Sequence, residues 1–269
     1  PAAVAATGPA GVFRSPMRTG CAVGTLWTTC GRRIDEAFLQ GLAQVKWTAD
    51  GVEPLLAESW DMEEGGKAYV FHLREGVTWH DGAPFTADDV VFSFNIFANP
   101  AIGSTYAAKL ADVVGYDEFQ AGTATELAGV TKIDDKTVRV ALKSPSPLWV
   151  ELQQISISIL PNHILGSVAP EEMRTNAYWK NMVGTGPFVM TKFVDDQYIE
   201  GVANETYFLG KPKLDKIVFQ IYADTTAILN ALEAGELDAT PYEGGGIPLD
   251  QVQRFEAMEH LTVLGNMDA

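Results

Sequence analysis

Three segments with alternating apolar and polar side chains are interleaved with segments of helical periodicity, and this order restricts the folds open to the chain. The alternating segments are residues 69–74 (YVFHLR), 137–142 (TVRVAL) and 214–222 (LDKIVFQIY). A two-residue period is typical of strands that have one buried and one solvated face. Because strands and helices follow one another along the chain, the sequence predicts a mixed α/β (α+β) fold.

A capped helix is predicted shortly after the first alternating strand. Thr86 has a side chain suited to an N-cap, and Asp88 and Asp89 follow in the first turn, where the helix dipole favours carboxylates. Before the strand, the Gly65-Gly66 pair predicts a hairpin turn from an earlier strand at residues 57–63. This part of the chain is therefore predicted to form a hairpin, a turn and a helix.

A second helix is predicted from an N-cap at Asp224 to a stop at Gly235. The strand at residues 214–222 precedes this helix, and Glu236-Leu237-Asp238-Ala239 follows it. The order resembles a β-α-β unit, which predicts a further strand directly after the helix.

The charge balance disfavours several classes of partner. The chain has 35 acidic and 19 basic residues, for a net charge of −16. Such a surface repels nucleic-acid phosphates and anionic lipid headgroups, so we expect no nucleic-acid partner. With 269 residues that are 46% apolar, the chain can bury one large core or two modest ones. No apolar run approaches the roughly 18 residues of a membrane span.

The N-terminal region predicts a mature segment. Residues 1–11 are rich in Ala, Pro and Gly and lack the basic and apolar regions of a signal peptide. Residues 19–21 (TGC) weakly resemble a lipid-attachment site, but arginines stand where an apolar stretch should precede it, so we reject that interpretation. Cys21 and Cys30 are either two small buried thiols or a local disulfide.

Catalytic and metal-binding motifs are missing from the sequence. There is no GxSxG, HExxH, Walker or GxGxxG pattern, and the four histidines are scattered without a Cys/His cluster. We therefore expect no cofactor, no metal site and no enzymatic activity. The sequence alone leaves a paired-carboxylate hydrolase open, although nothing singles out a pair.

Several blocks of the sequence resemble the family 5 extracellular solute-binding proteins of ABC importers. The most characteristic block, YVFHLREGVTWHDGAPFTADDVVFSF at residues 69–94, contains a strand, a turn and the capped helix. The other matching blocks are residues 54–60 (PLLAESW), 184–188 (GTGPF), 204–207, 210–215 and 217–239. Members of this family bind oligopeptides, dipeptides, nickel chelates, haem, glutathione or oligosaccharides.

The resemblance implies a periplasmic-binding-protein type II-like fold, of which this chain would hold the larger lobe only. Family members are roughly twice this long and close two lobes on a ligand around a hinge. We expect a mixed-sheet core from residues 1–45 and 183–269, and an inserted subdomain from residues 46–182. The second lobe is expected to be absent from this chain.

The resemblance also points to candidate ligand-binding residues in three regions. Relatives contact ligand through a Thr/Ser/Gly stretch near the N-terminus, although an exposed Thr-rich loop is an equally good interpretation here. A second wall could be residues 154–158 (QISIS), after a helix predicted near Trp149, although a strand is at least as good an interpretation there. Tyr106 could project from the inserted subdomain. The candidates are Thr28, Thr29, Cys30, Gly31, Tyr106, Gln154, Ser156 and Ser158.

The resemblance predicts a solute-binding component of an ABC importer that captures peptide-like or similar small solutes. Its partners would be the solute and a membrane permease, and we expect a monomer. It would be periplasmic or extracellular, and could be lipid-anchored through a removed N-terminal segment. One alternative is a nickel or metal-chelate binder of the same family. Another, from a different class, is a ligand-sensing or chaperone-like module without transport.

Overall fold

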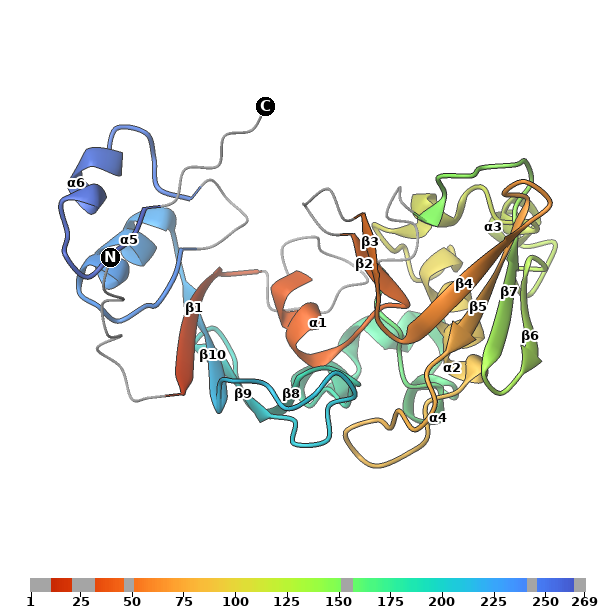
Figure 1. Ribbon diagram of the computed structural model, residues 1–269, viewed down its shortest axis with the longest axis horizontal. Helices are drawn as coiled ribbons and strands as arrows, with labels where there is room; N and C mark the ends of the chain where they lie inside the picture. The colour runs from red at the N-terminus through yellow and green to blue at the C-terminus, as the bar shows by residue number, and fades with distance from the viewer. Residues whose placement is uncertain (1–10, 21–31, 46–50, 151–156, 241–245, 264–269) are drawn as a thin grey trace.

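A computed structural model of the chain describes residues 11–20, 32–45, 51–150, 157–240 and 246–263. Two four-stranded sheets lie one after the other along its long axis (Figure 1). Helices α5 (Thr225–Glu233) and α6 (Val252–Glu256) lie beyond the first sheet, at one end of the molecule. The predicted mixed α/β class is confirmed.

The first sheet has the order β1-β10-β9-β8. Its strands are β1 (Val12–Arg18), β8 (Phe188–Val194), β9 (Tyr198–Ala203) and β10 (Lys216–Tyr222). β1 pairs parallel to β10, and the other neighbours are antiparallel. The strand predicted at residues 214–222 is therefore confirmed, and it begins two residues later than expected.

The second sheet is antiparallel throughout, with the order β4-β5-β7-β6. Its strands are β4 (Ala57–Glu63), β5 (Ala68–Leu73), β6 (Val130–Asp134) and β7 (Thr137–Ala141). The hairpin predicted at Gly65-Gly66 joins β4 to β5. Gly66 has φ +94, and a β-carbon there would approach the backbone nitrogen of Pro147 to 2.7 Å, so the turn requires glycine.

Helix α2 (Ala87–Ala98) packs against β6 and β7 and begins where the sequence predicts. Thr86 is its N-cap, and the Thr86 N–H donates to the Asp89 carboxylate at 2.9 Å. This bond satisfies one of the free N–H groups at the start of the helix.

Shorter elements connect and cover the sheets. β2 (Ala43–Val45) pairs antiparallel with β3 (Val52–Pro54) in a separate two-stranded sheet. These elements are α1 (Arg32–Phe38), β2 (Ala43–Val45), β3 (Val52–Pro54), η1 (Ala107–Leu110), α3 (Tyr116–Gln120), α4 (Asn162–Leu165), η3 (Pro170–Thr175) and η4 (Ala177–Lys180). None of the helices in the described parts of the chain is long and apolar enough to cross a bilayer.

The predicted β-α-β unit is only partly formed. Asp224 caps α5 as expected, since the Ala227 N–H donates to its carboxylate at 2.8 Å. Between α5 and residue 240 no strand is assigned, and the parallel neighbour of β10 is β1, from the start of the chain. Asp238 does donate its backbone N–H to Arg14 O, so this segment lies along the outer edge of β1 without building a ladder.

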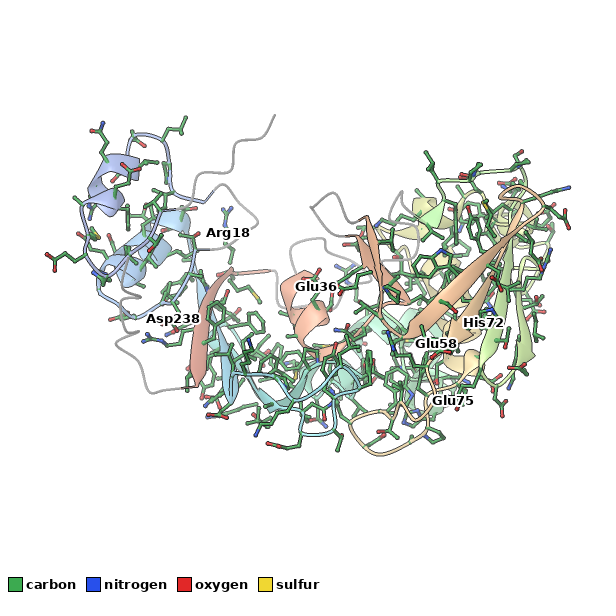
Figure 2. All side chains as sticks on the ribbon, viewed as in Figure 1. Arg18, Glu36, Glu58, His72, Glu75 and Asp238 are labelled. Atoms are coloured by element: carbon green, nitrogen blue, oxygen red, sulfur yellow. The ribbon has the colours of Figure 1, made fainter. Side chains whose placement is uncertain are left out.

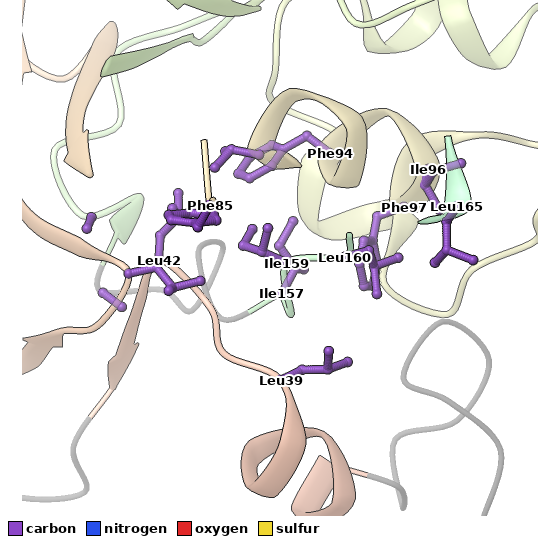
Figure 3. Close-up of a cluster of buried hydrophobic side chains, with 14 of the residues drawn as sticks. Leu39, Leu42, Phe85, Phe94, Ile96, Phe97, Ile157, Ile159, Leu160 and Leu165 are labelled. Atoms are coloured by element: carbon purple, nitrogen blue, oxygen red, sulfur yellow. The ribbon is translucent and has the colours of Figure 1, made fainter. Parts of the chain in front are cut away.

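One hydrophobic core runs through both sheets. Figure 3 shows its middle part, where Leu39 lies beyond the end of α1 and Phe94 and Phe97 come from α2. Ile159 and Leu160 lie between these elements. A smaller cluster joins α5 and α6. Residues of the predicted mixed-sheet core and of the predicted inserted subdomain both contribute to this hydrophobic core. The boundaries between those two parts stay a prediction.

Candidate ligand-binding site

A pocket of about 570 Å³, including the part that is open to solvent, lies where α1, β2 and η1 meet. Four regions of the sequence line it. The lining residues are Asp35, Glu36, Leu39, Gln40, Gly41, Ala43, Gln44, Leu55, Tyr106, Lys109 and Ser158.

The first wall is the end of α1 and the residues that follow it. Glu36, labelled on α1 in Figure 2, is exposed, whereas Asp35 is buried. The side-chain amide of Gln40 donates to Glu36 O at 2.9 Å, which satisfies a carbonyl left free at the helix end. The Ile159 N–H donates to Gln40 O at 2.8 Å. Gln40 therefore fixes the helix end against the segment that carries Ser158.

The second wall is the small β2–β3 sheet. Gln44 pairs with Glu53 across this sheet, and its amide donates to the Glu53 carboxylate at 2.8 Å. Leu55 follows β3, and its backbone N–H donates to Leu42 O at 3.0 Å. The apolar Leu55 and the polar Gln44 thus line the pocket from a small sheet that these hydrogen bonds hold in place.

The third wall is η1. The Lys109 ammonium lies 4.9 Å from the centre of the Tyr106 ring, a cation–π geometry. The Tyr106 ring also packs edge-to-face with Phe97 of α2, with ring centres 6.2 Å apart. Because α2 belongs to the core, the Tyr106 ring is held by a rigid element, and it in turn supports Lys109.

The pocket joins charges of both signs to amides, a hydroxyl and apolar side chains. Asp35 and Glu36 supply carboxylates, Lys109 supplies an ammonium, and Gln40 and Gln44 can both donate and accept hydrogen bonds. Such a lining can orient a polar or zwitterionic molecule by hydrogen bonds and charge. Among the described residues, no group of three or more His, Cys, Asp or Glu side chains could hold a metal ion.

The structure brings two of the predicted site residues together. Tyr106 and Ser158 line the same pocket, although 52 positions separate them in the chain. The other candidates (Thr28, Thr29, Cys30, Gly31, Gln154 and Ser156) lie outside the described residues, as does Cys21. A ligand contact by any of the eight stays a prediction.

Sequence reasoning did not find Asp35, Glu36, Gln40, Gln44 and Lys109. These residues have no motif spacing, because their walls come from segments around residues 35–44 and 106–109 that meet only in the fold. The one usable signal was the resemblance, which led to Tyr106, three residues before Lys109.

Comparison with known proteins gives a consistent result. The sequence model of the family described as bacterial extracellular solute-binding proteins, family 5 Middle, matches residues 51–266. A putative ABC transporter peptide-binding protein of Brucella ovis is 38% identical over 186 residues, which is 69% of this chain and 32% of that protein. The dipeptide-binding protein of Escherichia coli is 34% identical over 213 residues, which is 75% of this chain and 38% of that protein.

Solved structures agree with the sequence matches. NikZ from Campylobacter jejuni in complex with Ni(L-His) superposes with a TM-score of 0.76 at 26% identity, covering 93% of this chain and 46% of that one. Haemophilus influenzae OppA in complex with the peptide RPPGFSPFR superposes with a TM-score of 0.79 at 25% identity, covering 93% and 48%. The chain thus spans about a third of the length of these curated relatives and about half of these solved structures.

Proposed function

The chain belongs to the bacterial extracellular solute-binding proteins of family 5, and from that premise we propose that it forms a solute-capturing part of an ABC importer's binding component. The observation that carries the proposal is the pocket of mixed polarity between α1, β2 and η1. Its carboxylates, ammonium and amides suit a peptide-like solute, which has charged ends and a hydrogen-bonding backbone.

The proposed mechanism is reversible capture. Side-chain and backbone groups replace the water that surrounds the solute, and the apolar Leu39 and Leu55, from two different walls, exclude water from it. No bond is made or broken, and a membrane permease receives the solute. In this proposal the pocket is one wall of a site that a second lobe completes by closing over the solute.

The chain organisation follows from the same proposal. A mixed-sheet core from residues 1–45 and 183–269 would carry an inserted subdomain from residues 46–182, and the second lobe would lie outside this chain. We place the protein in the periplasm or outside the cell, as a monomer without a nucleic-acid partner. Attachment through an N-terminal lipid is part of the proposal.

A nickel-chelate binder is the second candidate. The structural likeness to NikZ, solved with Ni(L-His), favours it. A nickel–histidine complex also presents carboxylate and amine groups, so the same polar pocket could receive it through hydrogen bonds rather than through protein–metal bonds.

A thermal-shift panel on the protein as its gene encodes it separates these candidates. The probes are RPPGFSPFR, L-alanyl-L-alanine and Ni(L-His). A solute that binds only the native state stabilises it, by about 2.7 kcal/mol at a solute concentration of 100 times its Kd. This stabilisation raises the melting temperature. We expect a peptide to do so. Stabilisation by Ni(L-His) alone would favour the second candidate, and a panel without any shift would contradict a capture role for these solute classes.

Two matched variants connect the result to the pocket. Lys109→Met keeps the apolar stem of the side chain and removes its charge, so it should weaken binding of the stabilising solute. Glu58→Gln, on the exposed face of β4 and away from the pocket, should leave binding unchanged. Equal binding by both variants and the wild type would show that the solute binds elsewhere.

A further inference from the structure

His80 connects two loops through both nitrogens of its ring. The Gly184 N–H donates to His80 Nδ1 at 3.1 Å, and His80 Nε2 donates to Gly186 O at 3.0 Å. The backbone N–H of His80 also donates to Gly184 O at 2.8 Å. Because Nδ1 accepts and Nε2 donates, this arrangement needs the neutral ring with its proton on Nε2.

The segment that His80 holds is pressed against the end of α1. The Gly186 N–H donates to Phe38 O at 2.9 Å. A β-carbon would lie 2.7 Å from Phe38 C at Gly184 and 2.6 Å from the same atom at Gly186, so neither position has room for a side chain. Asn204 supports the contact from the other side, since its side-chain amide donates to Gly186 O at 3.1 Å. His80, residues 184–186 and Phe38 therefore form a continuous chain of contacts.

This chain of contacts ends at the pocket. Phe38 is the last residue of α1, and Leu39 and Gln40, which follow it, line the first pocket wall. The Phe38 ring is fully buried and packs edge-to-face on Phe219 of β10, at 6.3 Å between ring centres. A shift of residues 184–186 would therefore be passed on to Phe38 O and to the backbone that positions Leu39 and Gln40.

We infer that His80 is a positioning residue for solute binding: its neutral ring holds residues 184–186 against Phe38 and so fixes the first pocket wall. The inference rests on the proposed function for its effect on solute affinity. A second proton on the ring would place an N–H at Nδ1 opposite the Gly184 N–H, and this hydrogen bond would be lost. Acidification therefore loosens the wall and weakens capture.

The groups around His80 set the pH range of this effect. Burial lowers the pKa of His80 below its ordinary 6.5 and outweighs the Gly186 carbonyl and the Asp81 charge, which raise it. The acid limb of the affinity profile should therefore lie below pH 6.5. Asp81 is paired with His163 at 2.8 Å. Burial acts to raise the pKa of Asp81, but its hydrogen bonds and the nearby His163 hold it below the ordinary value, so Asp81 stays ionised there.

Two further groups face this region from neighbouring elements. The buried Tyr178 of η4 donates to Val183 O at 3.0 Å, and burial raises its pKa far above the ordinary value, so it stays neutral. Asp89 of α2 accepts from the Trp79 indole next to His80, and burial raises its pKa. Asp89 is therefore one group whose titration could overlap that of His80, and the variants below separate the two.

The deciding measurement uses His80→Gln and His80→Phe in the protein as its gene encodes it. Glutamine offers one acceptor and one donor but does not titrate, whereas phenylalanine has neither. His72→Gln is the matched control, because His72 is only half-buried and pairs with Asp61 on the outer face of β4 and β5. The affinity for RPPGFSPFR and the amide hydrogen exchange of Gly186 are measured for each protein between pH 4.5 and pH 8.

The wild type and His72→Gln should lose roughly tenfold in RPPGFSPFR affinity on the acid side, as expected for one buried hydrogen bond. His80→Gln should show a flat profile over this range, and His80→Phe should bind weakly at every pH. Without peptide, the protection of the Gly186 N–H should fall on acidification in the wild type but not in His80→Gln.

The two possible failures are distinguishable. If no probe binds the wild type at any pH, the proposed function fails, and the Gly186 exchange profile still decides whether the His80 contact exists and titrates. If RPPGFSPFR binds but the wild type and His80→Gln have the same pH profile, the capture role stands and the inference about His80 is overturned. Unchanged Gly186 protection in His80→Phe would overturn it as well.

Discussion

Arg14 and Asp238, at opposite ends of the described chain, form a bidentate ion pair on the outer edge of β1. The Arg14 Nη2 and Nε atoms lie 2.8 and 3.0 Å from the two oxygens of Asp238, which also accepts the Arg14 backbone N–H at 2.7 Å. Asp238, labelled in Figure 2, returns its own N–H to Arg14 O. The pair closes the edge of the first sheet where a further strand could otherwise add.

Asp238→Asn should destabilise the protein by about 1–3 kcal/mol, because it removes the charge from a largely buried bidentate pair and one of its acceptor oxygens. Denaturant unfolding at pH 7 measures the change. Asp195→Asn, which breaks the exposed Lys180–Asp195 pair, is the control and should have little effect. Equal loss in both variants would contradict a special role for Arg14–Asp238.

The same pair predicts a pH dependence of stability. Burial acts to raise the pKa of Asp238, but hydrogen bonds from Arg14 and its charge outweigh this and hold the pKa below its ordinary 3.8. The folded state therefore binds the proton more weakly than the unfolded state. The stabilisation is fully present above pH 3.8 and is lost as the pH falls through the folded-state pKa. Acid unfolding of Asp238→Asn should lack this component.

Asp89→Asn should destabilise the start of α2 by about 1–3 kcal/mol, because the buried carboxylate accepts three hydrogen bonds and an amide has one acceptor oxygen. The donors are Thr86 N and Asn162 N at 2.9 Å and Trp79 Nε1 at 3.3 Å. Chemical unfolding measures the loss. Asp88→Asn, at an exposed position of the same turn, should cost clearly less.

Ser93→Ala should cost about 1–3 kcal/mol although it removes a single oxygen. The fully buried Ser93 hydroxyl accepts the Leu160 N–H at 2.8 Å and donates to Asp89 O at 2.6 Å. Alanine leaves the Leu160 N–H without its acceptor in a dry environment. Thr123→Ala, at an exposed hydroxyl, is the control for unfolding experiments. A loss no larger than in the control would mean that water replaces the hydroxyl.

Gly186→Ala should destabilise by about 1–3 kcal/mol through steric overlap, because the new methyl group would lie 2.6 Å from Phe38 C and 2.7 Å from Ala37 O. Gly76→Ala separates sterics from backbone strain. Gly76 has φ +71 with nothing within 4 Å of a β-carbon, so this variant should lose only about 1 kcal/mol. Thermal unfolding compares the two. A smaller loss at Gly186 would contradict the tight contact with α1.

Several local elements were predictable because their signals lie within a few residues. The N-cap at Thr86 and the glycine pair of the β4–β5 hairpin both work through backbone groups close in sequence. The prediction of a strand after α5 was wrong because the partner of that segment is distant in the sequence. The segment around Asp238 meets β1 rather than building its own ladder, and no local signal reports a partner more than two hundred residues away.

The pocket illustrates the same division. Tyr106 and Ser158 were predicted as ligand-binding residues from the resemblance to a family, and the structure places both in the lining of the pocket. Lys109 and Gln40 have no sequence signal of their own. Their position depends on Tyr106 packing on Phe97 and on the Ile159 N–H that donates to Gln40 O, and both contacts join distant segments.

The sequence by itself determined the periodicity of the strands, the start of α2, both ends of α5 and the acidic surface, because each depends on neighbouring side chains or on composition alone. Only the tertiary structure decided which segments meet: β1 with β10, residues 184–186 with Phe38, and η1 with α1 around the pocket. The physical reason is that burial and shape select these contacts from many that local propensity allows equally well.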